Sequence, residues 1–281
     1  MTDPETIRTL RSLLRRVDDH DQAVALEEGA RRESLNMLDV VYHPTNPLPT
    51  LNYLTPRRGA AWVSTNAVQD GLYRLAELGR APRLLYLEGL MPPIFRQSLE
   101  SLGLQLAGES QIYACAAPDS VAASDTGFVV TIASQTAALL RWWYARSYIL
   151  AGGIQRQTDG MIVERMRHQI EAGRACFLEL WHGMQTIGVA SLRLQPALHS
   201  AEVSAFHLST QDEAAAKVLM AEALHVAAAA GCDLVFVAEA LADDHWLQEL
   251  QFMSLGSVVA FAARVSSKVN PDDRLAESLH P

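Results

Sequence analysis

The sequence lacks the features that would place a protein in a membrane or outside the cell. No apolar run approaches the roughly 18 residues of a membrane-spanning helix, and the most apolar stretch, residues 137–150, is interrupted by Arg141 and Arg146. The first residues, Met1-Thr-Asp-Pro4, contain no basic segment followed by an apolar one, so we expect no secretory signal. Both observations predict a cytoplasmic protein without a membrane partner.

Cysteine and positive charge are also scarce. The three cysteines, Cys115, Cys176 and Cys232, are widely spaced and form no CxxC pair, which predicts buried free thiols rather than disulfides or a metal site. The formal net charge of −9 gives no basic surface for nucleic acid, so we expect no nucleic-acid partner.

Several catalytic signatures are absent as well. The chain has no G-x-S-x-G nucleophile turn, no Cys/His pairing pattern and no Walker loop. Asp243-Asp-His245 is a compact group of possible metal ligands. Consecutive helical residues point about 100° apart and cannot converge on one ion, so we expect no metal.

The sequence does contain signs of an internal duplication. Residues 82–116 and 232–262 share one order of elements: an apolar strand that ends in a carboxylate, a short helix and a closing strand. Each copy follows a helix that ends at a glycine, Gly79 or Gly231, suited to a left-handed cap. Chance similarity between two Leu- and Ala-rich stretches is the alternative.

A chain of 281 residues is long enough for two domains of ordinary size. The small, polar run 117–127 has no periodicity and predicts the boundary. We therefore expect an N-terminal domain over residues 1–118, a C-terminal domain over residues 126–268 and a polar tail over residues 269–281.

The expected elements differ between the halves. The first half should open with helices at 4–16 and 21–38, followed by a Pro-rich, non-helical loop at 43–50. In the second half the patterns predict strands at 128–133, 176–181, 185–194, 201–208, 233–238 and 257–265, and helices at 135–150, 160–172, 211–230 and 243–250.

The second half resembles the GNAT acyltransferase superfamily. Phe206-His-Leu-Ser-Thr-Gln211 is similar to the family's V-x-P-x-x-R/Q, and the residues from Gln211 to Leu219 are similar to its pyrophosphate motif R/Q-x-x-G-x-G/A. Leu247-Gln-Glu-Leu-Gln-Phe252 is similar to Y-x-x-L-G-F, and Gly188-Val-Ala-Ser191 to a common strand motif. The resemblance covers almost all of the C-terminal half, and the N-terminal half resembles a shorter, divergent copy.

This resemblance implies an α/β (α+β) fold of two tandem GNAT-like domains, each a mixed, largely antiparallel sheet flanked by helices, with a degenerate N-terminal copy. It implies an N-acyltransferase that uses acetyl-CoA or another acyl-CoA and transfers the acyl group to the amine of a small molecule or peptide. Such a protein would be a monomer or a homodimer. The donor-binding residues that it implies are Phe206, His207, Leu208, Gln211, Ala214, Ala215 and Ala216.

The chain departs from the family's pattern where the pyrophosphate should bind. Ala214 replaces the first glycine, and Asp212 and Glu213 add two carboxylates that would each cost on the order of 1 kcal/mol near a phosphate. Thr210 and Glu213 have capping-box spacing, which would occupy the free N–H groups of the helix. A non-catalytic binding or regulatory module with the same fold, or an enzyme with a different donor, is therefore the alternative.

Two carboxylates are candidates for the base that deprotonates the amine, Glu202 and Glu239. Counting with period two places Ser204 and Phe206 on the face of Glu202, and Val203, Ala205 and His207 on the other. The family's usual acid, a tyrosine, falls at Leu247. A solvated strand end for Glu202 and a helix cap for Glu239 are the structural alternatives.

Two further groups are candidates for binding the acceptor. Trp142, Tyr144 and Tyr148 form an aromatic cluster, which would otherwise fill the core. Arg57 and Arg58 precede a glycine and would clamp a phosphate or carboxylate, or lie in a solvated loop.

Overall fold

The structure, a computed structural model, describes residues 4–60, 62–116, 127–151, 159–238 and 245–263. Its strands form one 11-stranded sheet in the order β1-β2-β3-β4-β11-β5-β10-β9-β8-β7-β6. The strands are β1 (Arg31–Leu35), β2 (Leu38–Tyr42), β3 (Tyr53–Pro56), β4 (Arg83–Leu87), β5 (Leu104–Ala116), β6 (Phe128–Ile132), β7 (Ala175–His182), β8 (Gln185–Gln195), β9 (Ser200–Leu208), β10 (Leu234–Val237) and β11 (Met253–Ala263).

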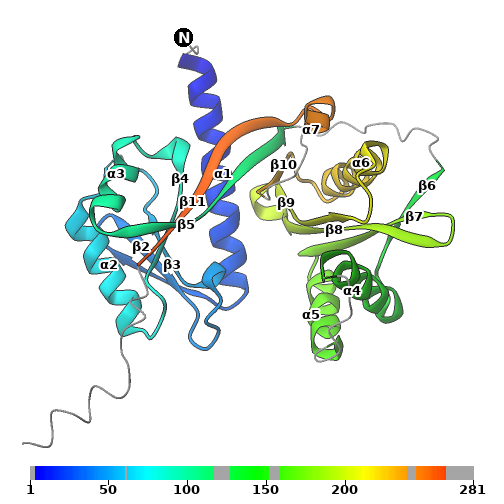
Figure 1. Ribbon diagram of the computed structural model, residues 1–281, viewed down its shortest axis with the longest axis horizontal. Helices are drawn as coiled ribbons and strands as arrows, with labels where there is room; N and C mark the ends of the chain where they lie inside the picture. Colours follow the sequence, from blue (N-terminus) through cyan, green and yellow to red (C-terminus); the bar gives the residue numbers. More distant parts are fainter. Residues whose placement is uncertain (1–3, 61, 117–126, 152–158, 239–244, 264–281) are drawn as a thin grey trace, which may run out of the picture.

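Helices cover both halves of the sheet. They are α1 (Pro4–Glu27), α2 (Thr65–Glu77), α3 (Ile94–Ser101), α4 (Thr136–Ala151), α5 (Asp159–Glu171), α6 (Glu213–Ala229) and α7 (His245–Glu249). Figure 1 shows two halves side by side, with α1 between them, and with α6 on one face of the C-terminal half and α4 and α5 on the other. Short 3-10 turns lie at Pro49–Leu51, Glu88–Leu90 and Pro196–Leu198.

The strand order confirms the duplication and the mixed, largely antiparallel sheet. The series β1-β2-β3-β4-β11 corresponds in order to β7-β8-β9-β10-β5. Each series contains one parallel pair, β3 with β4 and β9 with β10, and the other neighbouring strands pair antiparallel. Both parallel pairs are short: Leu54 pairs with Leu84 alone, and the second pair ends at Glu202 and Phe236.

The two halves exchange their closing strands, which the sequence did not reveal. β5 comes from the first half of the chain and pairs with β10, whereas β11 comes from the second half and pairs with β4. β5 and β11 also pair with each other along most of their length and join the halves at the centre of the sheet (Figure 1). Neither predicted domain therefore contains all the strands of its own part of the sheet.

The N-terminal half differs from the sequence expectation before β2. α1 is one helix that ends at Glu27, and residues 31–42 form a hairpin where a helix was predicted to residue 38. Gly29 has a φ of 95° and ends the helix, and Asn36 has a φ of 53° in the tight turn between Leu35 and Leu38. The prediction over residues 31–38 was wrong because this local turn and sheet pairing outweigh helix propensity.

Other expectations hold. The predicted strands and helices of the C-terminal half are present within a few residues in its described part, and Gly79 and Gly231 have φ values of 69° and 80° after α2 and α6. All three cysteines are buried, and none of these described residues forms a disulfide. No element was predicted for the residues of β3, which follow the expected loop at residues 43–50.

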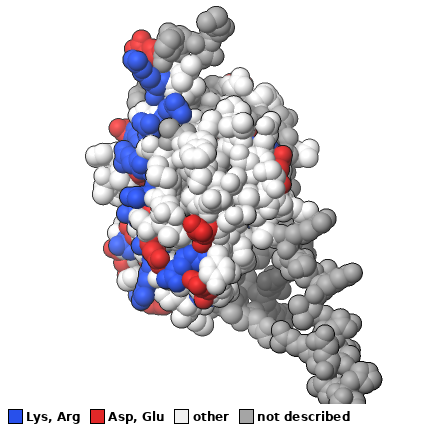
Figure 2. Space-filling view, turned by 90° about the vertical axis from the view of Figure 1, so that its left-hand side faces the viewer, with Lys and Arg blue, Asp and Glu red and all other residues white. Residues whose placement is uncertain are grey.

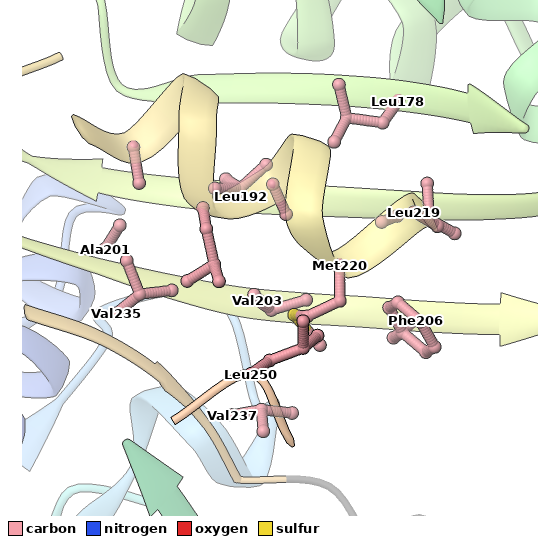
Figure 3. Close-up of a cluster of buried hydrophobic side chains, with 14 of the residues drawn as sticks. Leu178, Leu192, Ala201, Val203, Phe206, Leu219, Met220, Val235, Val237 and Leu250 are labelled. Atoms are coloured by element: carbon pink, nitrogen blue, oxygen red, sulfur yellow. The ribbon is translucent and has the colours of Figure 1, made fainter. Parts of the chain in front are cut away.

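The alanine-rich helix α6 packs closely on the C-terminal sheet. Its Leu219 and Met220 contact a fully buried layer formed by β7 to β10, shown in Figure 3. The small alanine side chains allow the helix to approach the sheet. In the N-terminal half, Val259 and Phe261 from β11 complete the core beneath α2 and α3, so the last strand of the chain stabilises the first half.

Candidate active site

Helix α1 places polar side chains against the sheet of the other half. His20 is fully buried, and its Nδ1 lies 2.9 Å from the Ser200 hydroxyl at the start of β9. Its Nε2 lies 4.0 Å from an oxygen of Glu202. Burial and the positive charge of Arg193 lower the pKa of His20 to about 3, so the imidazole is neutral near pH 7.

Glu202, the predicted base, is held by an arginine. Arg193 of β8 donates from Nη2 to Oε1 of Glu202 at 2.9 Å, and its Nε lies 2.8 Å from Oε2. The carboxylate is therefore buried and ion-paired rather than solvated at a strand end. Burial and the neighbouring Glu202 raise the pKa of Asp21, which lies one residue beyond His20 on α1.

A pocket lined by four arginines lies where β3 and β4 diverge. It has a volume of about 160 Å³. Its cations are Arg11 and Arg15 of α1 and Arg57 and Arg58, which follow β3. Arg58 pairs with Asp19 at 3.1 Å, and Arg15 makes no hydrogen bond or ion pair with another described residue. Figure 2, which faces the N-terminal half, shows Lys and Arg side chains along one edge below the start of the chain.

Asp18 of α1 also lines this pocket. Burial, reinforced by the nearby carboxylate of Asp19, raises the pKa of Asp18 to about 6, although a hydrogen bond from Gln22 opposes the shift. A carboxyl group with a pKa near neutrality in a concave site is suited to accepting and releasing protons. The pocket thus combines anion-binding guanidinium groups with a candidate base.

The start of α6 is closed by a carboxylate. Asp212 is the N-cap residue, and its Oδ1 accepts hydrogen bonds from the backbone N–H groups of Ala214 at 2.9 Å and Ala215 at 3.3 Å. Glu213 pairs instead with Lys217 and with His245, whose Nε2 lies 3.1 Å away. The predicted capping box of Thr210 and Glu213 was therefore wrong, because the helix begins two residues later than that box requires and Asp212, not Thr210, is its N-cap.

The structure brings the predicted donor-binding residues together around the end of β9 and the start of α6. Phe206 is buried and stacks on Trp246 of α7, with ring centroids 5.7 Å apart. Ala215 and Ala216 are buried in the core, whereas Gln211 and Ala214 are exposed. His207 and Leu208 are half-buried, and burial lowers the pKa of His207. Their role in donor binding stays a prediction.

A β-bulge changes which side chains share the face of Glu202. The β8–β9 register skips Ser204, because Leu192 pairs with Val203 and Ser191 pairs with Ala205. Phe206 consequently packs with Val203 against α6, and Ala205 packs on the opposite face with α4 and α5. The period-two prediction was wrong beyond the bulge for this reason.

The predicted acceptor residues lie in three different places. Trp142 is buried, and its ring N–H donates to the carbonyls of Leu178 and Ala190, so it fills the core. Tyr148 is exposed and Tyr144 half-buried on the same helix. Arg57 and Arg58 line the arginine pocket in the other half. The second predicted base, Glu239, lies outside the described residues, and Leu247, at the position of the family's acid, is fully buried.

Sequence reasoning missed the contributions of α1. The missed residues are Arg11, Arg15, Asp18, His20, Asp21 and, on β8, Arg193. A usable signal was present, because three aspartates and a histidine follow one another at residues 18–21 of this helix. The site joins segments far apart in the sequence, so their proximity could not be read from spacing.

Comparison with solved structures identifies the fold. A GCN5-related N-acetyltransferase from Kribbella flavida superposes with a TM-score of 0.67 at 13% identity, over 86% of this chain and 93% of that chain. A tandem GNAT protein from the clavulanic acid biosynthesis pathway superposes with a TM-score of 0.51 at 13% identity, over 80% of this chain and 78% of that chain. This chain has the tandem GNAT fold.

A third structure with this fold, a GCN5-related N-acetyltransferase from Sphaerobacter thermophilus, gives a TM-score of 0.55 at 11% identity, over 80% of this chain and 79% of that chain. No family model and no curated protein sequence matches the chain significantly. The similarity is thus one of the GNAT fold and not of close sequence relationship.

The described residues lack two kinds of feature. None of the helices in this part of the chain is long and apolar enough to cross a membrane. Within the same residues, no group of three or more His, Cys, Asp or Glu side chains is arranged to hold a metal ion.

Proposed function

We propose that the chain is an acyl-CoA-dependent N-acyltransferase that transfers an acyl group, in the simplest case acetyl, to the amine of a small molecule or peptide. The tandem GNAT fold supports this chemistry. The observation that carries the proposal is the carboxyl group of Asp18, with a pKa of about 6, in a pocket lined by four arginines.

The donor phosphates bind in the arginine pocket under this proposal. Guanidinium groups form charge-assisted, bidentate hydrogen bonds with phosphate oxygens. The start of α6 is a poorer site, because the Asp212 carboxylate occupies two of its N–H groups and adds negative charge. The sequence had favoured the C-terminal half for the donor.

The reaction is a direct attack. The amine nitrogen forms a bond to the thioester carbonyl carbon, the C–S bond breaks, and CoA leaves as a thiolate. Asp18 accepts the proton that the amine loses, and the thiolate takes a proton from water. With a pKa of about 6, Asp18 is mostly ionised at neutral pH and ready to act as a base.

The C-terminal half is the second candidate for the same chemistry. It is favoured by the end of the β9–β10 pairing at Glu202 and by the bulge at Ser204, because bulges are common beside active sites. Glu202 would then act as the base after release from Arg193, and the donor would use the residues predicted around Gln211 and Ala214.

Titration of acetyl-CoA separates the two sites. We expect Arg58→Gln to weaken binding about tenfold, since one charge-assisted interaction is lost. Asp212→Asn is the matched control at the start of α6 and should leave the affinity unchanged. A tighter complex of Asp212→Asn with an unaffected Arg58→Gln would move the donor to the C-terminal half. No binding by folded protein at millimolar acetyl-CoA would reject acyl transfer and favour a non-catalytic module.

A further inference from the structure

A second cavity lies between the two halves, away from the arginine pocket. Its volume is about 440 Å³, a size suited to a small ligand. One wall is the C-terminal end of α1, and the opposite wall is formed by α5, the residue before β7 and the end of β8. The predictions from sequence assigned no residue to it.

The two walls carry opposite charges. Glu27, the last residue of α1, and Glu28, which follows it, supply carboxylates at a helix end whose dipole adds to the negative potential. Arg165, Arg174 and Arg193 supply guanidinium groups from the other wall.

Some of these charged groups still have hydrogen-bond donors that a ligand could use. Glu28 pairs with Arg165 at 3.0 Å, and Glu27 lies 3.5 Å from Nε of Arg174. The two terminal nitrogens of Arg174 have no hydrogen-bond partner among the described residues, and its side chain is 48% exposed. A carboxylate can therefore dock on Arg174 in a bidentate manner without breaking that contact.

Buried groups next to the cavity are also incompletely satisfied. Nε of Arg193, Oε2 of Glu202 and Nε2 of His20 are buried without an aligned hydrogen bond. Arg193 lines the cavity, whereas Glu202 and His20 do not. Nε of Arg193 already lies 2.8 Å from Oε2 of Glu202, so the cavity borders a buried, charged pair rather than an apolar wall.

We propose that this cavity binds a small zwitterion, an α-amino acid, with the carboxylate on Arg174 and the ammonium group at Glu28. A dianion would meet Glu27 and Glu28, and a simple amine would meet three guanidinium groups, so only a ligand with both charges matches both walls. The apolar lining is limited to Val24 and Ala172, which offer little apolar contact surface to a large hydrophobic side chain.

Calorimetric titration with four probes tests the proposal on the full chain. L-alanine should bind, whereas propionate and ethylamine, which each retain one of its charges, should bind at least about tenfold more weakly. L-glutamine should bind at least as tightly as L-alanine, because the cavity has room for a longer polar side chain. Equal affinity for propionate, or no binding of either amino acid, would overturn the proposal.

Two variants locate the binding. Arg174→Gln and Glu28→Gln should each weaken binding of L-alanine about tenfold. Arg167→Gln is the matched control, because Arg167 lies on α5 but pairs with Glu164 and Glu171 of its own helix and does not line the cavity. A loss of affinity in Arg167→Gln equal to that in Arg174→Gln would mean that the amino acid binds elsewhere and would overturn the assignment.

Discussion

Fragments 1–118 and 126–268 should not fold when each is produced alone. The first fragment lacks β11, so β4 loses its antiparallel partner and the core loses Val259 and Phe261. The second lacks β5, so β10 becomes an edge strand and β11 loses both partners. Circular dichroism and urea titration should show no cooperative transition for either fragment, whereas the two produced together should give a complex with native-like unfolding.

Two controls test the strand exchange behind this result. A chain that ends at residue 263, after β11, should keep a cooperative transition, which shows that truncation alone is tolerated. Phe261→Ala in the full chain should lower the free energy of unfolding by about 3–5 kcal/mol, the usual cost of emptying a fully buried phenylalanine site. A fragment 1–118 that unfolds cooperatively by itself would contradict the exchange.

Asp18→Asn should stabilise the protein at neutral pH while it removes activity. The pKa of Asp18 is about 6 in the folded chain, above its usual value of 3.8, so folding at pH 7 buries an ionised carboxylate at a cost of about 3 kcal/mol. The variant should therefore gain about 3 kcal/mol in free energy of unfolding above pH 6. The gain should shrink as the pH falls from 6 to 4, because the folded wild-type protein then takes up the proton.

Urea titrations of both proteins at several pH values measure this difference. The titration of His20 cancels in the comparison because both proteins contain it. Asp70→Asn, at an exposed position of α2, is the matched control and should follow the wild-type protein at every pH. A constant difference between Asp18→Asn and wild type from pH 4 to 8 would contradict a raised pKa.

The Asp18→Asn variant also tests whether Asp18 is the general base. Loss of a general base lowers the rate by about 100-fold or more, and we expect this loss in kcat of Asp18→Asn, with acetyl-CoA affinity retained. Glu202→Gln is the informative comparison, because Glu202 is the base if the C-terminal half is active. Full activity of Asp18→Asn together with an inactive Glu202→Gln would move the reaction to that half.

The candidate site was only partly visible in the sequence. Arg57 and Arg58 were identified as a possible anion clamp, and they do line a pocket. Glu202 was identified as a base, but its partner Arg193 is placed by strand pairing between β8 and β9, which spacing alone does not give. Asp18 was missed because its pKa depends on burial between α1 and the sheet.

The sequence by itself determined the duplicated order of elements and the GNAT-like character of the second half. Periodicity is a local property, and strands and helices such as β9 and α6 follow from it directly. Turns are also set by residues that are close in the sequence. The hairpin at residues 31–42 was nevertheless missed, because the same residues are compatible with a helix.

Only the tertiary structure decided which closing strand pairs with which half of the sheet, and where charged side chains lie close together. The sequences of β5 and β11 allow pairing within their own half equally well, and their exchange depends on contacts between segments more than 100 residues apart. The polar face of α1 gains its chemistry in the same way, because burial against distant strands sets the protonation of Asp18, His20 and Asp21.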